Sequence, residues 1–275
     1  HKLGSVDELL AVGRECFDIF QSWDPDSYIE HLAVAEGAGV DAIELFTAGN
    51  MTDFRDVVML GKTPDAEGCS AVLIPGARSF DGDILVGQTW DLNPQDIEYV
   101  VGIHRKPENA PETWSVTVSG CPSLVGMNAD GVAVGTTNIK TWGSRVGVGY
   151  MNLLHRALSK SDFESASDVI LSAPRSGAHT YWVADENNAC LWETTPTQAE
   201  PRDVSTHGPV YQTNHCLYNE IVANEWQPAS SSSLSRHARL EQAFESGLQT
   251  LESLRTLFSD RSDGIDSLNR YPEDD

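Results

Sequence analysis

Hydrophobic residues recur at helical spacing through about the first fifty residues of the chain. Residues 5–23 predict a helix, because Leu9, Leu10, Val12, Cys16, Phe17 and Phe20 fall on one stripe. Ser5 and Glu8 have the spacing of a capping box at its start. Further helices are predicted over residues 27–36 and 41–48. The N-terminal part of the chain is therefore predicted to be helical.

The pattern changes at Cys69, where short apolar runs begin to alternate with turn signals such as Asp-Gly. The predicted strands cover residues 70–74, 84–90, 99–103, 114–118, 131–135, 181–184 and 189–193. Helical patterns cover residues 150–159, 163–172, 234–244 and 248–257. Helices and strands in this order predict an α+β fold, in which antiparallel sheets lie between layers of helices.

The composition is that of a globular protein with an acidic surface. Hydrophobic residues make up 40 %, and 41 acids against 18 bases give a net charge of −23. This charge should repel phosphate backbones and anionic lipids, so we expect no nucleic-acid partner and no membrane partner. The excess of acids is otherwise typical of a solvated surface, and it indicates no particular substrate.

The five cysteines are widely spaced and odd in number: Cys16, Cys69, Cys121, Cys190 and Cys216. No C-x-x-C pair, H-E-x-x-H motif or G-x-G-x-x-G loop occurs, so neither a metal nor a nucleotide cofactor is expected. A free thiol suits a reducing compartment, and no apolar run approaches the roughly 20 residues that span a bilayer. We therefore expect a cytoplasmic protein without a cofactor.

Cys69 stands between Gly68 and a predicted strand, and the following strand ends at Asp91. If the intervening turn centres near Phe80, antiparallel pairing brings Asp91 almost opposite Cys69. A turn centred at Asp81 would shift the pairing by a few residues. Taken alone, Cys69 could be a buried core cysteine, since free cysteines usually are, and Asp91 a turn residue.

Several short segments together resemble the isopenicillin N acyltransferase family, whose relatives include choloylglycine hydrolases, penicillin V acylases and acid ceramidases. The segments are residues 68–70, 87–91, 126–132, 137–138, 181–185, 192–193, 213–215 and 232–236. Each match is weak alone, but their shared order along residues 37–240 is specific.

The resemblance implies a four-layer αββα N-terminal-nucleophile hydrolase fold and self-cleavage between Gly68 and Cys69. Residues 1–68 would form a helical N-terminal segment, kept after cleavage as a second subunit. Residues 69–275 would form the catalytic subunit of the same domain. Cleavage would free the α-amine of Cys69 to act as the base for its own thiol. The ordinary pKa values, about 7.7–8.0 for an α-amine and about 8.5 for a thiol, are well matched for this transfer.

The family pattern also implies roles for four further residues. Asp91 would hold the α-amine, Asn214 would donate to the oxyanion, and Asn138 is a second oxyanion donor. Arg236 would favour the thiolate of Cys69. Asn214 as a turn residue and Arg236 as a surface cation are the alternatives.

Two departures from the family pattern affect the prediction. Gln88 stands where the bile-salt and penicillin V branch usually has Arg, which favours the acyltransferase branch. The family continues into a closing strand pair beyond residue 275, so either this chain is trimmed there or that edge of the sheet is missing.

The predicted function is hydrolysis of a linear, non-peptide amide of a small molecule through a Cys69 thioester. The alternatives are transfer of the acyl group to an amine, and a non-catalytic binding protein with this fold. A homo-oligomer stays open. The substrate pocket is expected from the segment after Ala48 and the loops around Trp142 and Trp226.

Overall fold

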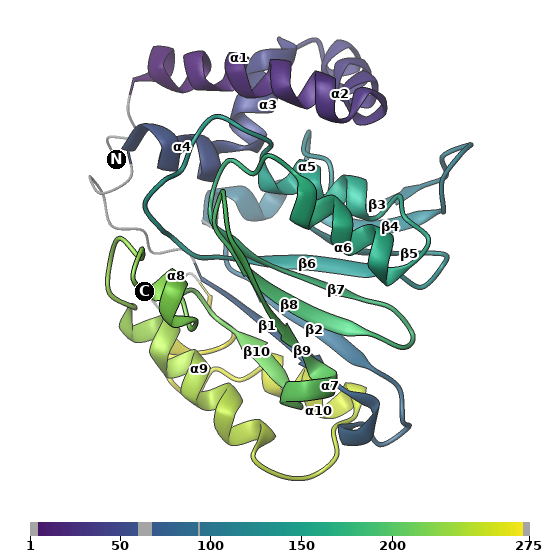
Figure 1. The fold of residues 1–275 in the computed structure, drawn as a ribbon, viewed down its shortest axis with the longest axis vertical. Coiled ribbons are helices and arrows are strands. Elements are labelled where there is room, and N and C mark those ends of the chain that lie inside the picture. The colour runs from purple at the N-terminus through teal and green to yellow at the C-terminus, as the bar shows by residue number, and fades with distance from the viewer. Residues whose placement is uncertain (1–4, 60–67, 93, 272–275) are drawn as a thin grey trace.

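The computed structural model describes residues 5–59, 68–92 and 94–271. The sequence also predicts a loop at residues 65–67, directly before Gly68, and these residues lie outside the described ranges. Figure 1 shows a layered molecule in which two sheets lie between helices, with the N-terminal helices stacked on one side. This arrangement confirms the predicted α+β class and its αββα layers.

The N-terminal segment consists of helices α1 to α4, which are Val6–Trp23, Pro25–Ala38, Ala42–Gly49 and Met51–Met59. The capping box at Ser5 and Glu8 is present, and Gly39 ends α2 in the left-handed conformation with a φ of 69°. Helix α4 was not predicted from the sequence. The four helices share an aromatic core, in which Phe20 and Phe46 stack at 5.3 Å between ring centroids.

Within the described ranges, the strands form a three-stranded and a seven-stranded sheet, both antiparallel. The small sheet has the order β10-β1-β2, with β1 at Cys69–Ile74, β2 at Leu85–Trp90 and β10 at Val210–Gln212. The large sheet runs in sequence order through β3 Val100–Arg105, β4 Thr113–Val118, β5 Val125–Asn128, β6 Ala133–Asn138, β7 His179–Ala184, β8 Ala189–Thr194 and β9 Ala199–Asp203.

The remaining helices cover the outer faces of the sheets or lie within the connections between other elements. They are α5 Tyr150–Ala157, α6 Phe163–Ser172, α7 Val204–His207, α8 Asn219–Val222, α9 Ser231–Phe244 and α10 Leu251–Phe258. Short 3₁₀ turns lie at Gly76–Arg78, Pro94–Tyr99 and Gly264–Asp266. Helix α6 has the predicted bounds, whereas α9 begins three residues earlier than predicted because Ser230 caps it.

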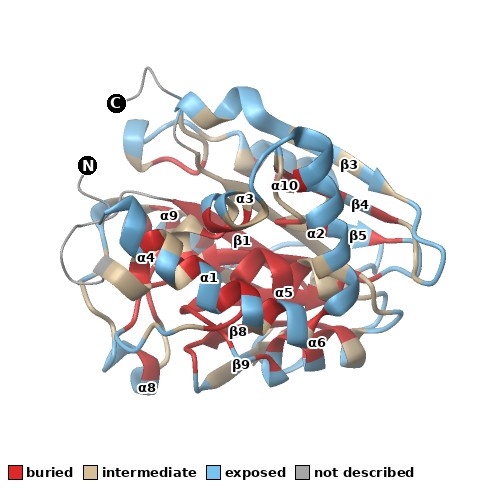
Figure 2. Cartoon of the chain, turned by 90° about the horizontal axis from the view of Figure 1, so that it is seen from above, coloured by how far each residue is buried: buried red, intermediate tan, exposed pale blue. Residues whose placement is uncertain are grey.

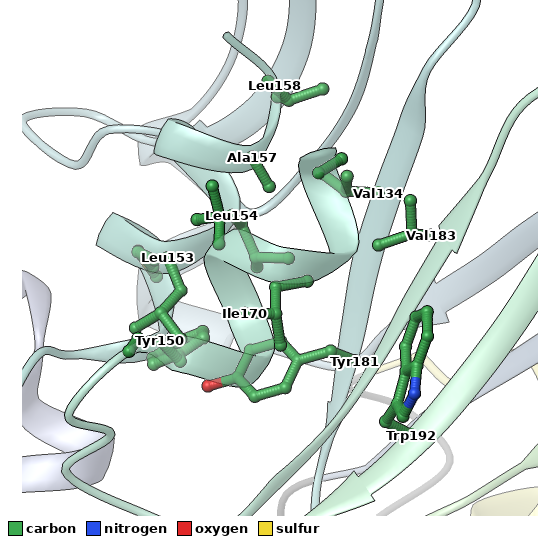
Figure 3. Packing of buried hydrophobic residues seen from close by; sticks show 14 of the residues in the cluster. Val134, Tyr150, Leu153, Leu154, Ala157, Leu158, Ile170, Tyr181, Val183 and Trp192 are labelled. Atoms are coloured by element: carbon green, nitrogen blue, oxygen red, sulfur yellow. The ribbon is translucent and has the colours of Figure 1, made fainter. Parts of the chain in front are cut away.

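Three apolar clusters hold the layers together. Figure 3 shows the first, in which Leu153, Leu154 and Ile170 of α5 and α6 pack on Tyr181 and Trp192 of the large sheet. A second cluster fills the space between the two sheets, and a third packs the small sheet against α9 and α10. Figure 2 shows the buried residues concentrated in β1, β8 and the inner face of α5. Strand β1, buried at every residue, therefore lies at the centre of the molecule.

Three strands and several boundaries differ from the sequence prediction. Strands β5, β9 and β10 were missed, because β5 is four residues long with an internal glycine, β9 contains polar residues and a proline, and β10 is only three residues long. The strand predicted at residues 131–135 begins instead at Ala133, because Gly131 lies in the turn between β5 and β6 with a φ of 90°.

Candidate active site

The β1–β2 hairpin brings Asp91 beside the Gly68–Cys69 linkage. Cys69 pairs with Trp90 in the antiparallel register, which corresponds to a turn centred near Phe80. Asp91 follows directly, and its backbone N–H donates to the Gly68 carbonyl at 2.8 Å. The predicted pairing is therefore confirmed to within one residue. Cys69 is buried, with 9 % of its surface exposed, and it shares the inter-sheet face of β1 with Ala71.

Position 68 accommodates only a glycine, because a side chain there would collide with neighbouring groups. A Cβ at this position would lie 2.1 Å from Asp91 Oδ2 and 2.4 Å from Arg270 Nη2. The Asp91 carboxylate and the Arg270 guanidinium therefore pack directly against the Gly68 backbone. They are also joined to each other by a hydrogen bond from Arg270 Nη2 to Asp91 Oδ2.

Asn214 follows strand β10 and holds the other side of the linkage. Its Oδ1 accepts from the Cys69 backbone N–H at 2.7 Å and from Arg236 Nη2 at 2.9 Å. Both of these groups can only donate, so the amide oxygen must face them. The Asn214 Nδ2 is thereby directed to the Asn138 carbonyl, at 2.9 Å. The orientation of this amide is thus fixed by its partners.

Arg236 reaches the site from α9 and is 1 % exposed. Its guanidinium donates to the Cys69 carbonyl and, at 2.9 Å, to Ser70 Oγ, in addition to Asn214. Burial lowers the pKa of Arg236, while the charges of Asp91 and Cys69 raise it. Arg236 is therefore not a surface cation. Its guanidinium bridges the backbone of Cys69 and the side chain of Asn214.

Asn138 ends strand β6 and lies at a small polar cavity of about 30 Å³. The cavity is lined by Asn138, Lys140, Asn214, Glu225, Gln227, Pro228 and Ser230. Thr141 and Glu225 form an antiparallel bridge, so the loops around Trp142 and Trp226 lie side by side at this cavity. A second concavity of about 790 Å³ lies at α9 and α10, and it contains none of the predicted site residues.

Electrostatic forces at Asp91 oppose one another. Burial raises the pKa of the Asp91 carboxyl above its ordinary value, although the nearby charges of Arg270 and Arg236 act to lower it. The two cations therefore offset part of the cost of placing a carboxylate in this buried position.

A second layer of polar groups supports Asn214. The Asn214 backbone N–H donates to Ser233 Oγ at 2.8 Å, and Ser233 Oγ also bonds His215 Nδ1 at 2.8 Å. Burial, assisted by the positive charges of His237 and Arg236, lowers the pKa of His215 to about 4. The imidazole is consequently neutral at pH 7, and this network holds Asn214 without adding a charge.

The structure brings Cys69, Asp91, Asn138, Asn214 and Arg236 together, as the sequence predicts. Three neighbouring residues were missed: Arg270, Ser233 and His215. Ser233 and His215 lie in the family-like segments 232–236 and 213–215, so the sequence marks their positions but not their role. Arg270 lies 179 residues from Asp91, and no sequence pattern marks it.

Across residues 5–59, 68–92 and 94–271, no three or more His, Cys, Asp or Glu side chains gather as a metal site. In the same ranges, no helix has the length and apolarity needed to cross a bilayer.

Comparisons with known proteins match a family and a fold. The model of the acyl-coenzyme A:6-aminopenicillanic acid acyl-transferase family matches residues 78–275. The chain is 27 % identical over 256 residues to the 40 kDa form of acyl-coenzyme A:6-aminopenicillanic-acid-acyltransferase from Emericella nidulans. That match covers 92 % of this chain and 69 % of the relative.

Among solved structures, the chain resembles the Caenorhabditis elegans ortholog of N-acylethanolamine-hydrolyzing acid amidase. The TM-score is 0.54 at 11 % identity, over 70 % of this chain and 87 % of that chain. A conjugated bile acid hydrolase from Clostridium perfringens is less similar, with a TM-score of 0.41 at 13 % identity over 55 % of this chain and 54 % of that one. The likeness to the amidase shows the predicted N-terminal-nucleophile hydrolase fold.

Proposed function

The chain belongs to the acyl-coenzyme A:6-aminopenicillanic acid acyltransferase family, and from this we propose that it is a self-cleaving amidohydrolase with Cys69 as nucleophile. The observation that carries the proposal is the way the Gly68–Cys69 linkage is held. Its carbonyl accepts from the Asp91 N–H at 2.8 Å, and its amide N–H donates to Asn214 Oδ1 at 2.7 Å. The Gly68 oxygen, which gains negative charge during cleavage, and the Cys69 nitrogen, which gains a proton, therefore both have polar partners in place.

Self-cleavage begins when the Cys69 sulfur attacks the Gly68 carbonyl carbon. A carbon–sulfur bond forms, the carbon–nitrogen bond breaks, and the thiol proton is transferred to the departing nitrogen. Water then hydrolyses the thioester, which gives a Gly68 carboxyl group and a Cys69 residue with a free thiol and α-amine. The Asp91 N–H stabilises the transient charge on the Gly68 oxygen, as a preorganised donor does in acyl transfer.

Turnover repeats this chemistry on a small-molecule amide. The freed α-amine takes the thiol proton, since its ordinary pKa of about 7.7–8.0 is close to that of a thiol. The sulfur attacks the substrate carbonyl, the substrate's amine leaves with a proton, and water resolves the thioester. Asn214 Nδ2 retains a second hydrogen for the oxyanion, beside Asn138 at the small cavity.

Acyl transfer is the second candidate, favoured by the family match and by Gln88. Gln88 Oε1 accepts from the Thr136 N–H and from Trp182 Nε1, each at 2.9 Å, and so joins the two sheets. In this reaction an amine instead of water attacks the thioester. Product analysis with and without a competing amine distinguishes the two, because only acyl transfer yields a new amide.

The decisive experiment is intact-mass measurement of the purified protein and of Cys69→Ala. The parent should give two fragments, the larger beginning at Cys69, whereas Cys69→Ala should remain one chain. Cys121→Ala is the matched control, because burial raises the pKa of that thiol to about 11 and the variant should cleave as the parent does. Cleavage that persists in Cys69→Ala, or active parent protein in which residues 68 and 69 stay joined, refutes the proposal.

A further inference from the structure

Arg270 occupies a position that none of the predicted roles explains. It follows the last 3₁₀ turn of the described chain, and its Nη2 donates to Asp91 Oδ2. The two side chains are 17 % and 15 % exposed, so the pair is mostly withdrawn from water. An ion pair in this environment is screened much less than one on the surface.

The Arg270 guanidinium also packs against Gly68, beside the linkage that is proposed to break. A Cβ on Gly68 would lie 2.4 Å from Arg270 Nη2 and 2.1 Å from Asp91 Oδ2. Carboxylate and guanidinium are thus packed against the same backbone atoms. Arg236, the other nearby cation, directs its hydrogen bonds to Cys69, Ser70 and Asn214. Among the residues that the structure describes, the direct cationic contact to the Asp91 carboxylate therefore comes from Arg270.

The charge balance at Asp91 differs before and after cleavage. In the uncleaved chain the Cys69 nitrogen is a neutral amide, so the buried carboxylate needs another cation. Burial raises the pKa of Asp91, while Arg270 and then Arg236 lower it. Arg236 in turn faces Asp91, Cys69, Arg270 and Asp266. Protonated Asp91 could not attract the ammonium group that cleavage creates.

We propose, building on the proposed function, that Arg270 is a positioning residue for self-cleavage, which holds the Asp91 carboxylate as an anion against Gly68 until the Cys69 α-ammonium forms. Arg270 touches neither bond that changes in the reaction. Its effect passes through Asp91, whose negative charge attracts the nitrogen as that nitrogen gains its proton. Loss of Arg270 should therefore alter the pH dependence of cleavage and not only its rate.

The test follows self-cleavage of the full chain, purified in denaturant and diluted into buffers between pH 4 and pH 8. Fragments are quantified by intact mass over time for the parent, Arg270→Gln, Arg270→Lys and Arg239→Gln. Arg239→Gln is the matched control, because it removes an arginine–carboxylate pair with Asp260 at 2.7 Å in the same C-terminal region. Circular dichroism establishes that each variant has folded.

In Arg270→Gln, the acidic limb of the plot of cleavage rate against pH should move to higher pH by about one to three units. This is the change in pKa that one neighbouring opposite charge typically causes. Arg270→Lys should keep the limb near its parental position, and Arg239→Gln should leave it there. An unchanged limb in Arg270→Gln, or a slowing that is equal at every pH, overturns the proposal. So does a limb in Arg270→Lys displaced as far as in Arg270→Gln.

Two further results keep this test separate from the proposed function. If the parent does not cleave, or Cys69→Ala does, the proposed function itself fails. If the parent cleaves normally and Arg270→Gln follows its pH profile, the role of Arg270 alone is rejected. Should Arg270→Gln not fold, Arg270→Met carries the same test, because it keeps the aliphatic stem and removes the charge.

Discussion

Two aspartates that are largely shielded from water, Asp53 and Asp91, are held in different ways. Asp53 on α4 is 1 % exposed, and its two oxygens have partners in the body of the fold. Oδ2 accepts from the Tyr150 N–H at the start of α5 at 2.8 Å, and Oδ1 bonds His179 Nε2 at 2.6 Å. Asp91 instead pairs with Arg270 beside Gly68, where the chain is proposed to break.

The difference predicts that Asp53 serves the structure and that Asp91 serves the proposed reaction. Asp53 satisfies a backbone N–H at the positive end of α5 and a histidine on β7, so it joins the N-terminal segment to two elements at once. Neither partner changes in the proposed reaction. Asp91 has a partner that a new ammonium group could share. Substitution of Asp53 should therefore affect stability, and substitution of Asp91 should affect reaction rate.

Asp91→Asn should give the largest effect. The neutral amide cannot attract the nitrogen that gains a proton, so self-cleavage should slow by about 10²- to 10⁴-fold, the range for a group that assists proton transfer. Intact-mass time courses measure this rate. Stability should change by less than about 2 kcal/mol, because the amide oxygen can still accept from Arg270.

The stability of Asp91→Asn is measured by urea unfolding in the Cys69→Ala background, in which every variant is predicted to remain one chain. Cleavage of Asp91→Asn at the parental rate would show that the carboxylate takes no part in the reaction. A stability loss as large as that of an Asp53 variant would remove the distinction between the two aspartates.

Asp53→Ala should show the opposite pattern. Removing the carboxylate leaves a buried histidine and an N–H of α5 without their partner, a change that typically costs about 3–5 kcal/mol. The measurement is again urea unfolding in the Cys69→Ala background. Asp18→Ala, an exposed position on α1, is the control and should stay within about 0.5 kcal/mol of the parent. A loss in Asp53→Ala no larger than that of the control contradicts the structural role.

The same two aspartates show what the sequence could predict. Asp91 was placed correctly because hairpin pairing is local, so the turn near Phe80 fixes its position relative to Cys69. Asn138, Asn214 and Arg236 were identified through ordered motif segments, which carry the family's long-range contacts implicitly. The fold class followed similarly, since helical and strand patterns alternate clearly along most of the chain.

Contacts set only by tertiary packing were missed. Asp53 meets His179 across 126 residues, and its helix α4 was not predicted at all. Arg270 meets Asp91 across 179 residues. In both cases an ordinary charged residue gains its role from a partner brought close by the layers of the fold. Hydrophobic periodicity reports which face of an element is buried, but not which polar group meets which across layers.

Glu30 provides a third carboxylate and the smallest expected effect. It lies on α2, bonding Arg105 at 2.9 Å and His155 at 3.0 Å, and 43 % of its side chain is exposed. The hydrogen bond from His155, with the charges of His155 and Arg105, lowers its pKa to about 2 from an ordinary 4.5. Because the pair is screened by solvent, Glu30→Gln should lower stability at pH 7 by at most about 1 kcal/mol.

The sign of the Glu30 effect with pH follows from the lowered pKa. A carboxyl group that is more acidic in the folded state contributes its full stabilisation above pH 4.5 and loses it as pH falls toward 2. The gap in unfolding free energy between Glu30→Gln and its parent, both with Cys69→Ala, should therefore be constant above pH 4.5 and close toward pH 2. Glu36→Gln, at an exposed position of the same helix, should stay within about 0.5 kcal/mol of the parent. A gap that widens in acid would contradict the lowered pKa of Glu30. A gap as large as that of Asp53→Ala would mean that surface contacts and not the buried Asp53 hold the N-terminal segment.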